Sequence, residues 1–173
     1  MEFYSGFSLK NEEYLFNDFI QKGNYTICGF SYGAIKAVYA TLQRLKSGSR
    51  VDVLQLFSPA FFQTRDEKFK RLQYINYNKN INLYMKQFID GCFSPYEKKI
   101  IESKETRLDE LKDLLEYKWS LDELKSIENA NVKIEVYLGG MDKIINTNQA
   151  KDFFLQIATV TYIKDANHFL QIN

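Results

Sequence analysis

A serine stands between two glycines in the pentapeptide 29–33, Gly-Phe-Ser-Tyr-Gly, which has the pattern G-x-S-x-G. An apolar run, 25–28, precedes it, and a helical pattern of small and apolar residues, 34–38, follows it. A strand, a tight turn and a helix are the setting that holds a nucleophilic serine above a sheet. We therefore expect Ser31 to be a nucleophile. We also expect the backbone N–H of Tyr32, at the start of the helix, to stabilise an oxyanion.

A serine hydroxyl needs a base within hydrogen-bond reach, and the sequence contains one histidine, His168. This histidine directly follows the last predicted strand, where a base could reach the serine turn. A carboxylate should orient it, and Asp142 follows the penultimate predicted strand and the glycine pair 139–140. Asp165, just before the histidine, is a rival whose simpler interpretation is a solvated turn residue. The expected catalytic group is Ser31, His168 and Asp142.

A second oxyanion donor should come from the loop after the strand that adjoins the serine strand. The segment 5–7, Ser-Gly-Phe, follows the first predicted strand. We assign the role to the N–H of Phe7, with Gly6 allowing close approach. An ordinary strand-to-helix turn is the alternative interpretation of these residues.

The elements that must position these residues alternate along the chain. Runs rich in β-branched and aromatic residues predict strands over 1–5, 25–29, 51–58, 132–138 and 159–164. Helical patterns lie between them, over 11–22, 32–46 and 148–157. This alternation predicts an α/β fold with right-handed crossovers and a parallel sheet of about five strands.

The alternation stops between residues 60 and 131, where only helical patterns occur. No Pro- or Gly-rich linker bounds this stretch, so we predict one domain over residues 1–173. We interpret the insertion as a helical cap over the carboxyl ends of the strands. The alternative is that its helices simply cover the sheet, as some of them must.

Composition narrows the classes of function. With 23 Lys and Arg against 22 Asp and Glu, no global field favours nucleic acid or a membrane as partner. Two cysteines without metal-type spacing and one histidine predict neither a metal site nor a cofactor. The N-terminal residues do not resemble a signal peptide and no apolar run reaches membrane-spanning length, so we expect a cytoplasmic protein with reduced thiols. The oligomeric state stays open.

The order Ser31, Asp142, His168 is that of the α/β-hydrolases, and the sequence resembles this superfamily over essentially the whole chain. It is similar, more closely, to the pimeloyl-acyl-carrier-protein (pimeloyl-ACP) methyl ester esterases of biotin synthesis, especially the short BioV type. The segments that carry this similarity are 3–7, 29–37, 57–59, 69–73, 142–143 and 167–168. The resemblance implies a truncated α/β-hydrolase fold, with the first strands and one strand–helix pair before the serine turn missing.

The resemblance also implies a reaction. Pimeloyl-ACP methyl ester would be hydrolysed to pimeloyl-ACP and methanol without a cofactor, and the acyl carrier protein would be the partner. An apolar channel for the acyl chain is expected from aromatic residues, although core packing is the alternative for each of them. The candidates are Phe30, Phe61, Phe62 and Tyr74, together with Tyr32.

Acyl carrier proteins are acidic, so a basic rim would steer them to the site. Candidates for this rim cluster at the start of the insertion: Arg65, Lys68, Lys70 and Arg71. A solvated helix face is the alternative. Two other functions stay open: a different acyl-ester or acyl-ACP thioester hydrolase, and a catalytically inactive hydrolase fold that serves as a binding module.

Overall fold

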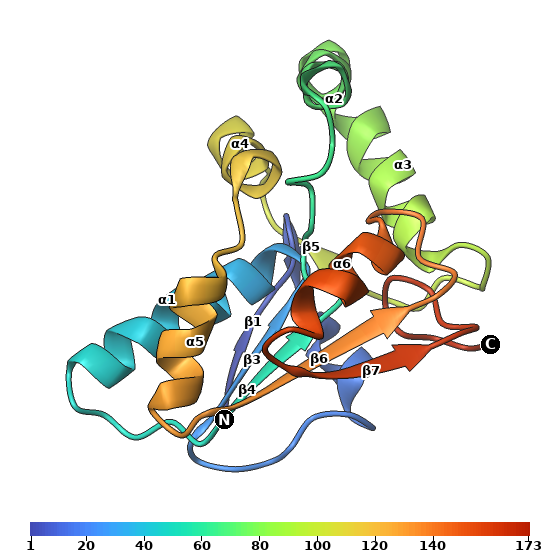
Figure 1. Cartoon of the computed structure of the whole chain (residues 1–173). Coiled ribbons are helices and arrows are strands. Elements are labelled where there is room, and N and C mark those ends of the chain that lie inside the picture. The colour runs from blue at the N-terminus through green and yellow to red at the C-terminus, as the bar shows by residue number, and fades with distance from the viewer.

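The computed structural model describes the whole chain, Met1–Asn173, and its centre is a five-stranded parallel sheet (Figure 1). The strand order is β1-β3-β4-β6-β7, and every neighbouring pair is parallel. The strands are β1 (Glu2–Tyr4), β3 (Thr26–Phe30), β4 (Val53–Phe57), β6 (Lys133–Gly139) and β7 (Thr159–Ile163). The five predicted strands and their parallel arrangement are therefore confirmed.

Alternate residues of the strands point to opposite faces of the sheet. On one face, Leu54 and Leu56 belong to a buried cluster that also contains residues of three crossover helices. These helices are α1 (Tyr32–Lys46), α5 (Leu121–Asn129) and α6 (Thr147–Phe154). The predicted helices over 32–46 and 148–157 correspond to α1 and α6. None of the helices is both long enough and apolar enough to span a membrane.

The other face is covered by irregular chain. Cys28 and Phe57 lie on this face, in a second buried cluster with Phe16 and Phe169. Phe16 ends η1 (Glu12–Phe16), a short 3-10 helix, and Phe169 belongs to the C-terminal segment. The rings of Phe16 and Phe57 stack with their centroids 4.8 Å apart.

The α-helix predicted over 11–22 is wrong, because only the five residues of η1 are helical. Two side chains explain the difference. Glu12 turns inward and accepts a hydrogen bond from the N–H of Gly6 at 2.7 Å. Gln55, on β4, bonds backbone groups of residues 19 and 21, which a continuous helix would pair internally.

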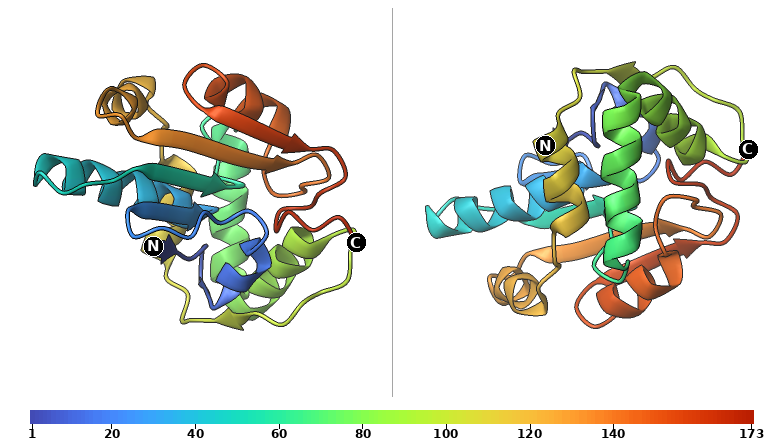
Figure 2. Two further views of the ribbon diagram at one scale, coloured as in Figure 1. Left: turned by 90° about the horizontal axis from the view of Figure 1, so that it is seen from below. Right: turned by 90° about the horizontal axis from the view of Figure 1, so that it is seen from above.

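The inserted stretch divides into two parts. The helices α2 (Glu67–Lys79), α3 (Ile81–Phe93) and α4 (Leu108–Glu116) lie beyond the carboxyl ends of the strands and cross above the sheet (Figures 1 and 2). Helix α5 instead packs against α1 and β6 and covers the sheet. A small antiparallel pair, β2 (Leu9–Lys10) with β5 (Glu102–Ser103), joins the insertion to the chain after β1 and was not predicted.

Candidate active site

Ser31 occupies a strained turn between β3 and α1. Its backbone angles are φ 52° and ψ −114°, a positive φ that non-glycine residues seldom adopt. The turn is held on both sides of the serine, since Ser31 N–H donates to the carbonyl of Phe57 at 2.9 Å and its carbonyl accepts from Ala60 N–H at 3.1 Å. Such strain persists only when the surroundings enforce it, and it is concentrated at functional sites.

The two glycines of the pentapeptide are explained by close backbone contacts. A Cβ atom on Gly29 would lie 2.3 Å from the carbonyl oxygen of Gly33. One on Gly33 would lie 1.9 Å from the carbonyl oxygen of Tyr4, at the end of β1. The pattern G-x-S-x-G is therefore a steric requirement of this turn.

The three predicted catalytic side chains lie in contact. His168 Nε2 is 3.0 Å from Ser31 Oγ, and His168 Nδ1 is 2.6 Å from Asp142 Oδ2. The other carboxylate oxygen of Asp142 accepts the N–H groups of Ile144 and Ile145, at 2.7 and 3.2 Å. With both oxygens engaged, this carboxylate is fixed in orientation and faces the imidazole. The rival, Asp165, is exposed and makes no side-chain hydrogen bond to His168.

The loops that carry Asp142 and His168 are fastened to each other. Gly140 N–H donates to the carbonyl of Ile163 and Met141 N–H to that of Ala166, both at 2.8 Å. A Cβ atom on Gly139 would lie 2.3 Å from the carbonyl oxygen of Asn167. The glycine pair therefore lets the two loops approach closely enough for the carboxylate to meet the histidine.

Asn167 is a positioning residue whose contacts could not be read from the sequence. It is fully buried. Its Nδ2 donates to the carbonyl of Phe93, at the end of α3, at 2.8 Å, and to Gln171 Oε1 at 2.9 Å. Its Oδ1 accepts the N–H groups of Phe169 and Gln171. The loop that bears His168 is thus fixed on both sides and tied to the insertion.

The two predicted oxyanion donors follow neighbouring strands: Tyr32 comes directly after the serine at the end of β3, and Phe7 follows β1, which pairs with β3. Tyr32 N–H belongs to the first turn of α1, whose N–H groups have no partner within the helix. Phe7 N–H makes no hydrogen bond to the rest of the protein. Gly6 packs on the ring of Phe30, where a Cβ atom would come within 2.8 Å of a ring carbon. The assignment of both donors to an oxyanion hole stays a prediction.

A cavity of about 310 Å³ is lined by the cap helices α2, α3 and α4 and by loop residues that follow the strands. Phe7 and Ile144 line it, and these residues belong to the predicted oxyanion loop and to the loop that bonds Asp142. The cavity is therefore linked to the Ser31–His168–Asp142 contacts through these two loops, although none of the three residues lines it. Of the aromatic residues predicted to line a channel, Phe62 lines this cavity.

The other aromatic candidates lie elsewhere. Phe30 is fully buried beneath the site, with its ring centroid 5.0 Å from that of His168. Phe61 packs in the core against Phe153 and Phe154. Tyr74 donates its hydroxyl to Glu116 at 2.8 Å and does not line the cavity. Tyr32 lines a separate, larger cavity of about 750 Å³ beside α1. None of these four residues lines the smaller cavity, so it gives no support to the prediction that they form a channel.

Among the basic residues predicted to form a rim, Lys70 must be excluded. It is 6% exposed, and its ammonium group contacts Glu116 at 2.8 Å and Glu67 at 3.2 Å. The hydrogen bond to Glu116 raises the pKa of Lys70, so the ammonium group stays charged and is paired with carboxylates of the insertion. Lys68 and Arg71 are exposed.

Arg65 has a different environment, since its guanidinium group stacks over the Phe69 ring at 4.9 Å and forms no ion pair. It lines the cavity together with Lys143, which also has no acidic partner. Two cations without an acidic partner therefore border an otherwise largely apolar cavity. No group of three or more His, Cys, Asp or Glu side chains gathers where a metal ion could bind.

Several solved structures, among them the protein BioG, an esterase and a lipase, have a similar fold. BioG from Haemophilus influenzae superposes with a TM-score of 0.57 at 12% identity, covering 98% of this chain and 88% of that one. The naproxen esterase of Bacillus subtilis gives a TM-score of 0.52 at 18% identity, covering 85% of this chain. A monoacylglycerol lipase from Paleococcus ferrophilus gives 0.51 at 12% identity, covering 96% of this chain and 84% of that one.

These identities are too low to show more than the fold. This chain spans 54% of the length of the naproxen esterase. No protein-family model matches the sequence, and no curated protein does. The parallel sheet, the crossover helices and these superpositions together confirm the predicted fold class, a five-stranded, truncated α/β-hydrolase fold.

Proposed function

We propose that this chain, which has an α/β-hydrolase fold, is a serine-dependent carboxylic ester hydrolase. The observation that carries the proposal is the unbroken line of contacts from Ser31 Oγ through the His168 ring to Asp142, at 3.0 and 2.6 Å. The side chains of His168 and Asp142 are both fully buried. A buried serine, imidazole and carboxylate in this sequence of contacts are the groups that nucleophilic acyl transfer requires.

The geometry supports the following steps. Asp142 accepts a hydrogen bond from Nδ1–H and so leaves Nε2 as the proton acceptor. Nε2 removes the proton of Ser31 as Oγ attacks the ester carbonyl. The resulting oxyanion is held by the N–H groups of Tyr32 and Phe7. The protonated His168 then gives its proton to the departing alkoxide, and water repeats the sequence to release the acid.

The cavity supports an ester with an extended acyl chain. Its volume of about 310 Å³ corresponds to roughly ten water molecules, at about 30 Å³ each. Phe7, Phe62 and Leu114 give it apolar walls, whereas Arg65 and Lys143 provide positive charge. An acyl chain could lie against the walls with an anionic or strongly polar group near the two cations.

The finer proposal is that the substrate is pimeloyl-ACP methyl ester, cleaved to pimeloyl-ACP and methanol in biotin synthesis. The sequence resemblance to the short pimeloyl-ACP methyl ester esterases supports it. The substrate also contains a thioester, so selectivity would be geometric: the methyl ester reaches Ser31 while the acyl carrier protein stays outside the cap. The exposed cations Lys68 and Arg71, near Arg65, are the remaining candidates for docking this acidic partner.

The test is incubation of pimeloyl-ACP methyl ester with the wild-type protein and with Ser31→Ala, followed by mass analysis of the carrier protein. Serine-dependent loss of the methyl group with an intact thioester is the expected result. Release of free carrier protein would instead identify a thioesterase. If only small aryl esters are cleaved, the chain is a serine hydrolase but the assignment to biotin synthesis is rejected. If no ester is cleaved, a catalytically inactive binding module is favoured.

A further inference from the structure

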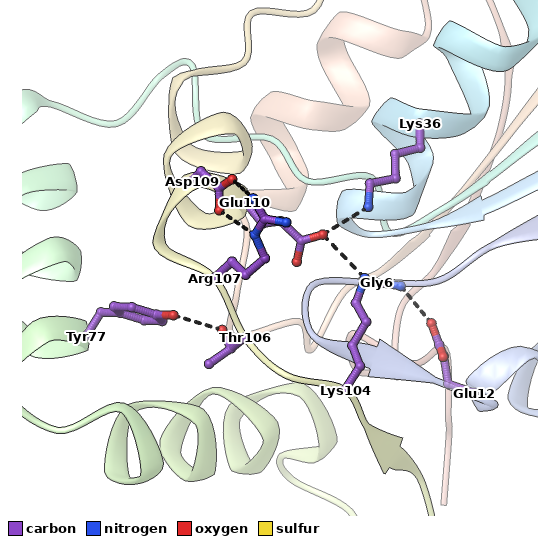
Figure 3. A network of polar contacts seen from close by, with 9 residues as sticks. All are labelled: Gly6, Glu12, Lys36, Tyr77, Lys104, Thr106, Arg107, Asp109 and Glu110. Carbon is purple, nitrogen blue, oxygen red and sulfur yellow. Dashed lines mark hydrogen bonds and ion pairs between the residues drawn. The ribbon is translucent and has the colours of Figure 1, made fainter.

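A buried carboxyl group lies behind the predicted oxyanion loop and takes no part in the steps above. The side chain of Glu12 is fully buried, and its Oε1 accepts a hydrogen bond from Gly6 N–H at 2.7 Å (Figure 3). Its second oxygen, Oε2, has no hydrogen-bond partner. Burial raises the pKa of this carboxyl above its ordinary value, although the bond from Gly6 opposes the shift. An acid held in this way is costly to the fold and calls for a role.

The hydrogen bonds on either side of Gly6 fix the orientation of its two peptide groups. The peptide group between Ser5 and Gly6 is held through its N–H by Glu12. The next peptide group is held through its carbonyl, because Gly6 C=O accepts from Leu9 N–H at 3.2 Å. In a trans peptide, C=O and N–H point in opposite directions. The N–H of Phe7 must therefore point away from Leu9, and it has no partner within the protein.

Glycine is the residue whose peptide groups rotate most easily, so this loop needs anchors. A larger residue cannot supply the stiffness, because a Cβ atom at position 6 would meet the ring of Phe30 at 2.8 Å. The insertion adds a further constraint. Lys104, just after β5, donates its N–H to the carbonyl of Ser8 at 3.0 Å, and its ammonium group reaches Glu110 of α4 at 3.3 Å (Figure 3).

We propose that Glu12 is a positioning residue of the oxyanion hole, which anchors Gly6 N–H and thereby keeps Phe7 N–H directed at the reacting carbonyl. This inference rests on the proposed function. Removal of the anchor lets the Ser5–Gly6 peptide rotate and carries the Phe7 N–H out of line. Because that donor acts on the oxyanion and not on the bound ester, its loss lowers kcat more than it changes KM.

The test compares Glu12→Leu, which removes the acceptor, with Glu12→Gln, which retains an acceptor oxygen at the same reach. A matched control is Glu13→Leu, since the neighbouring Glu13 makes no hydrogen bond through its side chain. With an aryl ester, Glu12→Leu should lower kcat by about 10- to 100-fold with KM changed less than about threefold. Glu12→Gln and Glu13→Leu should stay within about threefold of wild type for both constants.

A trifluoromethyl ketone, which forms an oxyanion adduct with the active serine, should lose affinity for Glu12→Leu by the same factor as kcat/KM falls. Exchange of the Gly6 amide proton should become faster in that variant and not in Glu12→Gln. If Glu12→Leu does not fold, Glu12→Asp, whose shorter side chain draws the acceptor back, should show the same kcat loss in part.

Three results would overturn the proposal: an unchanged kcat in a folded Glu12→Leu, an equal loss in Glu12→Gln, or a loss confined to KM. Absence of Ser31-dependent hydrolysis in the wild-type protein is a different result. It would reject the proposed function, and the positioning role with it.

Discussion

The carboxylate of Asp142 lies 2.6 Å from Nδ1 of His168, and neither side chain is exposed to solvent. The two residues follow neighbouring strands, β6 and β7, whose carboxyl ends meet at the same edge of the sheet. Because the second oxygen of Asp142 is occupied by two backbone N–H groups, the carboxylate cannot turn away from the imidazole. The sheet and one loop thus hold the carboxylate where it can accept a hydrogen bond from Nδ1–H of His168, the proposed base.

Asp142→Asn should lower kcat by about 10³- to 10⁴-fold, because an amide can present an N–H to Nδ1 and favour the wrong tautomer. Steady-state hydrolysis of an aryl ester measures the effect. Asp165→Asn is the matched control, since Asp165 is exposed and makes no contact with the ring. Equal losses in the two variants would argue against Asp142 as the orienting group.

Gly33→Ala should destabilise the fold by about 3 kcal/mol, the upper end of overpacking effects. Its Cβ atom would lie 1.9 Å from the carbonyl oxygen of Tyr4, and backbone cannot move aside as a side chain can. At about 2–4 °C per kcal/mol for a domain of this size, Tm should fall by roughly 6–12 °C.

The control for this prediction is Gly91→Ala, whose Cβ would meet only the flexible end of Ile144 at 3.1 Å. Its Tm should change by about 2 °C or less. Thermal unfolding followed by circular dichroism checks both variants. A Gly33→Ala variant as stable as Gly91→Ala would show that the serine turn is not packed as described.

The serine turn and the two loops could be predicted because each signal is local in sequence. A strand, a glycine-flanked serine and a helix occupy the 22 residues from 25 to 46, and the alternation of strands and helices fixes the edge of the sheet at which they meet. The role of Glu12 could not be predicted in this way. Its partner is a backbone N–H, that of Gly6, which carries no sequence signal.

Lys70 shows the same limitation for the cap. In the sequence it belongs to a basic cluster, but in the structure its side chain is buried in an ion pair with Glu116, 46 residues further along the chain. A charge run therefore predicts an exposed rim only where no distant carboxylate packs against it. A related limitation applies to the predicted channel residues, because Phe30 and Phe61 are buried against aromatic residues of other elements, which the sequence does not reveal.

The proposed docking of an acyl carrier protein can be tested by changing only the two exposed cations, Lys68 and Arg71. Lys68→Glu combined with Arg71→Glu should lower kcat/KM for pimeloyl-ACP methyl ester by about tenfold at low salt, through slower association. Activity on a small aryl ester should stay within about twofold of wild type. Equal loss on both substrates, or loss on neither, would reject docking at this surface.

Lys70→Ala should behave differently, because Lys70 joins α2 to α4. We expect a loss of about 1–2 kcal/mol in the free energy of unfolding, from the lost hydrogen bond to Glu116 and the lost packing of the side-chain stem. Urea denaturation measures it. A stable variant with a selective defect on the carrier-bound substrate would instead restore Lys70 to the docking surface.

The raised pKa of Glu12 predicts how stability depends on pH. In the folded protein this carboxyl holds its proton to a higher pH than in the unfolded chain, because burial disfavours the charged form. The protonated carboxyl makes its full contribution to stability at pH values below its pKa in the unfolded chain. This contribution is lost as pH rises through its higher pKa in the folded protein. Lys104, whose charge favours the ionised form, limits the loss.

Relative to Glu12→Gln, which cannot ionise, the wild-type protein should therefore lose stability as pH rises from about 4 toward 7. Urea denaturation of both proteins at the two pH values measures the difference in their free energies of unfolding. If the difference in free energy of unfolding is constant with pH, or if it changes in favour of the wild-type protein as pH rises, burial does not disfavour the ionised form of Glu12.

The central claim is that Ser31 is a nucleophile activated by His168. The most direct measurement is covalent labelling with a fluorophosphonate probe, followed by mass spectrometry of the intact protein and of its peptides. We predict one adduct per chain, located on Ser31, together with loss of aryl-ester hydrolysis, and no adduct in Ser31→Ala. An unlabelled wild-type protein, or an adduct on another residue, would contradict the account.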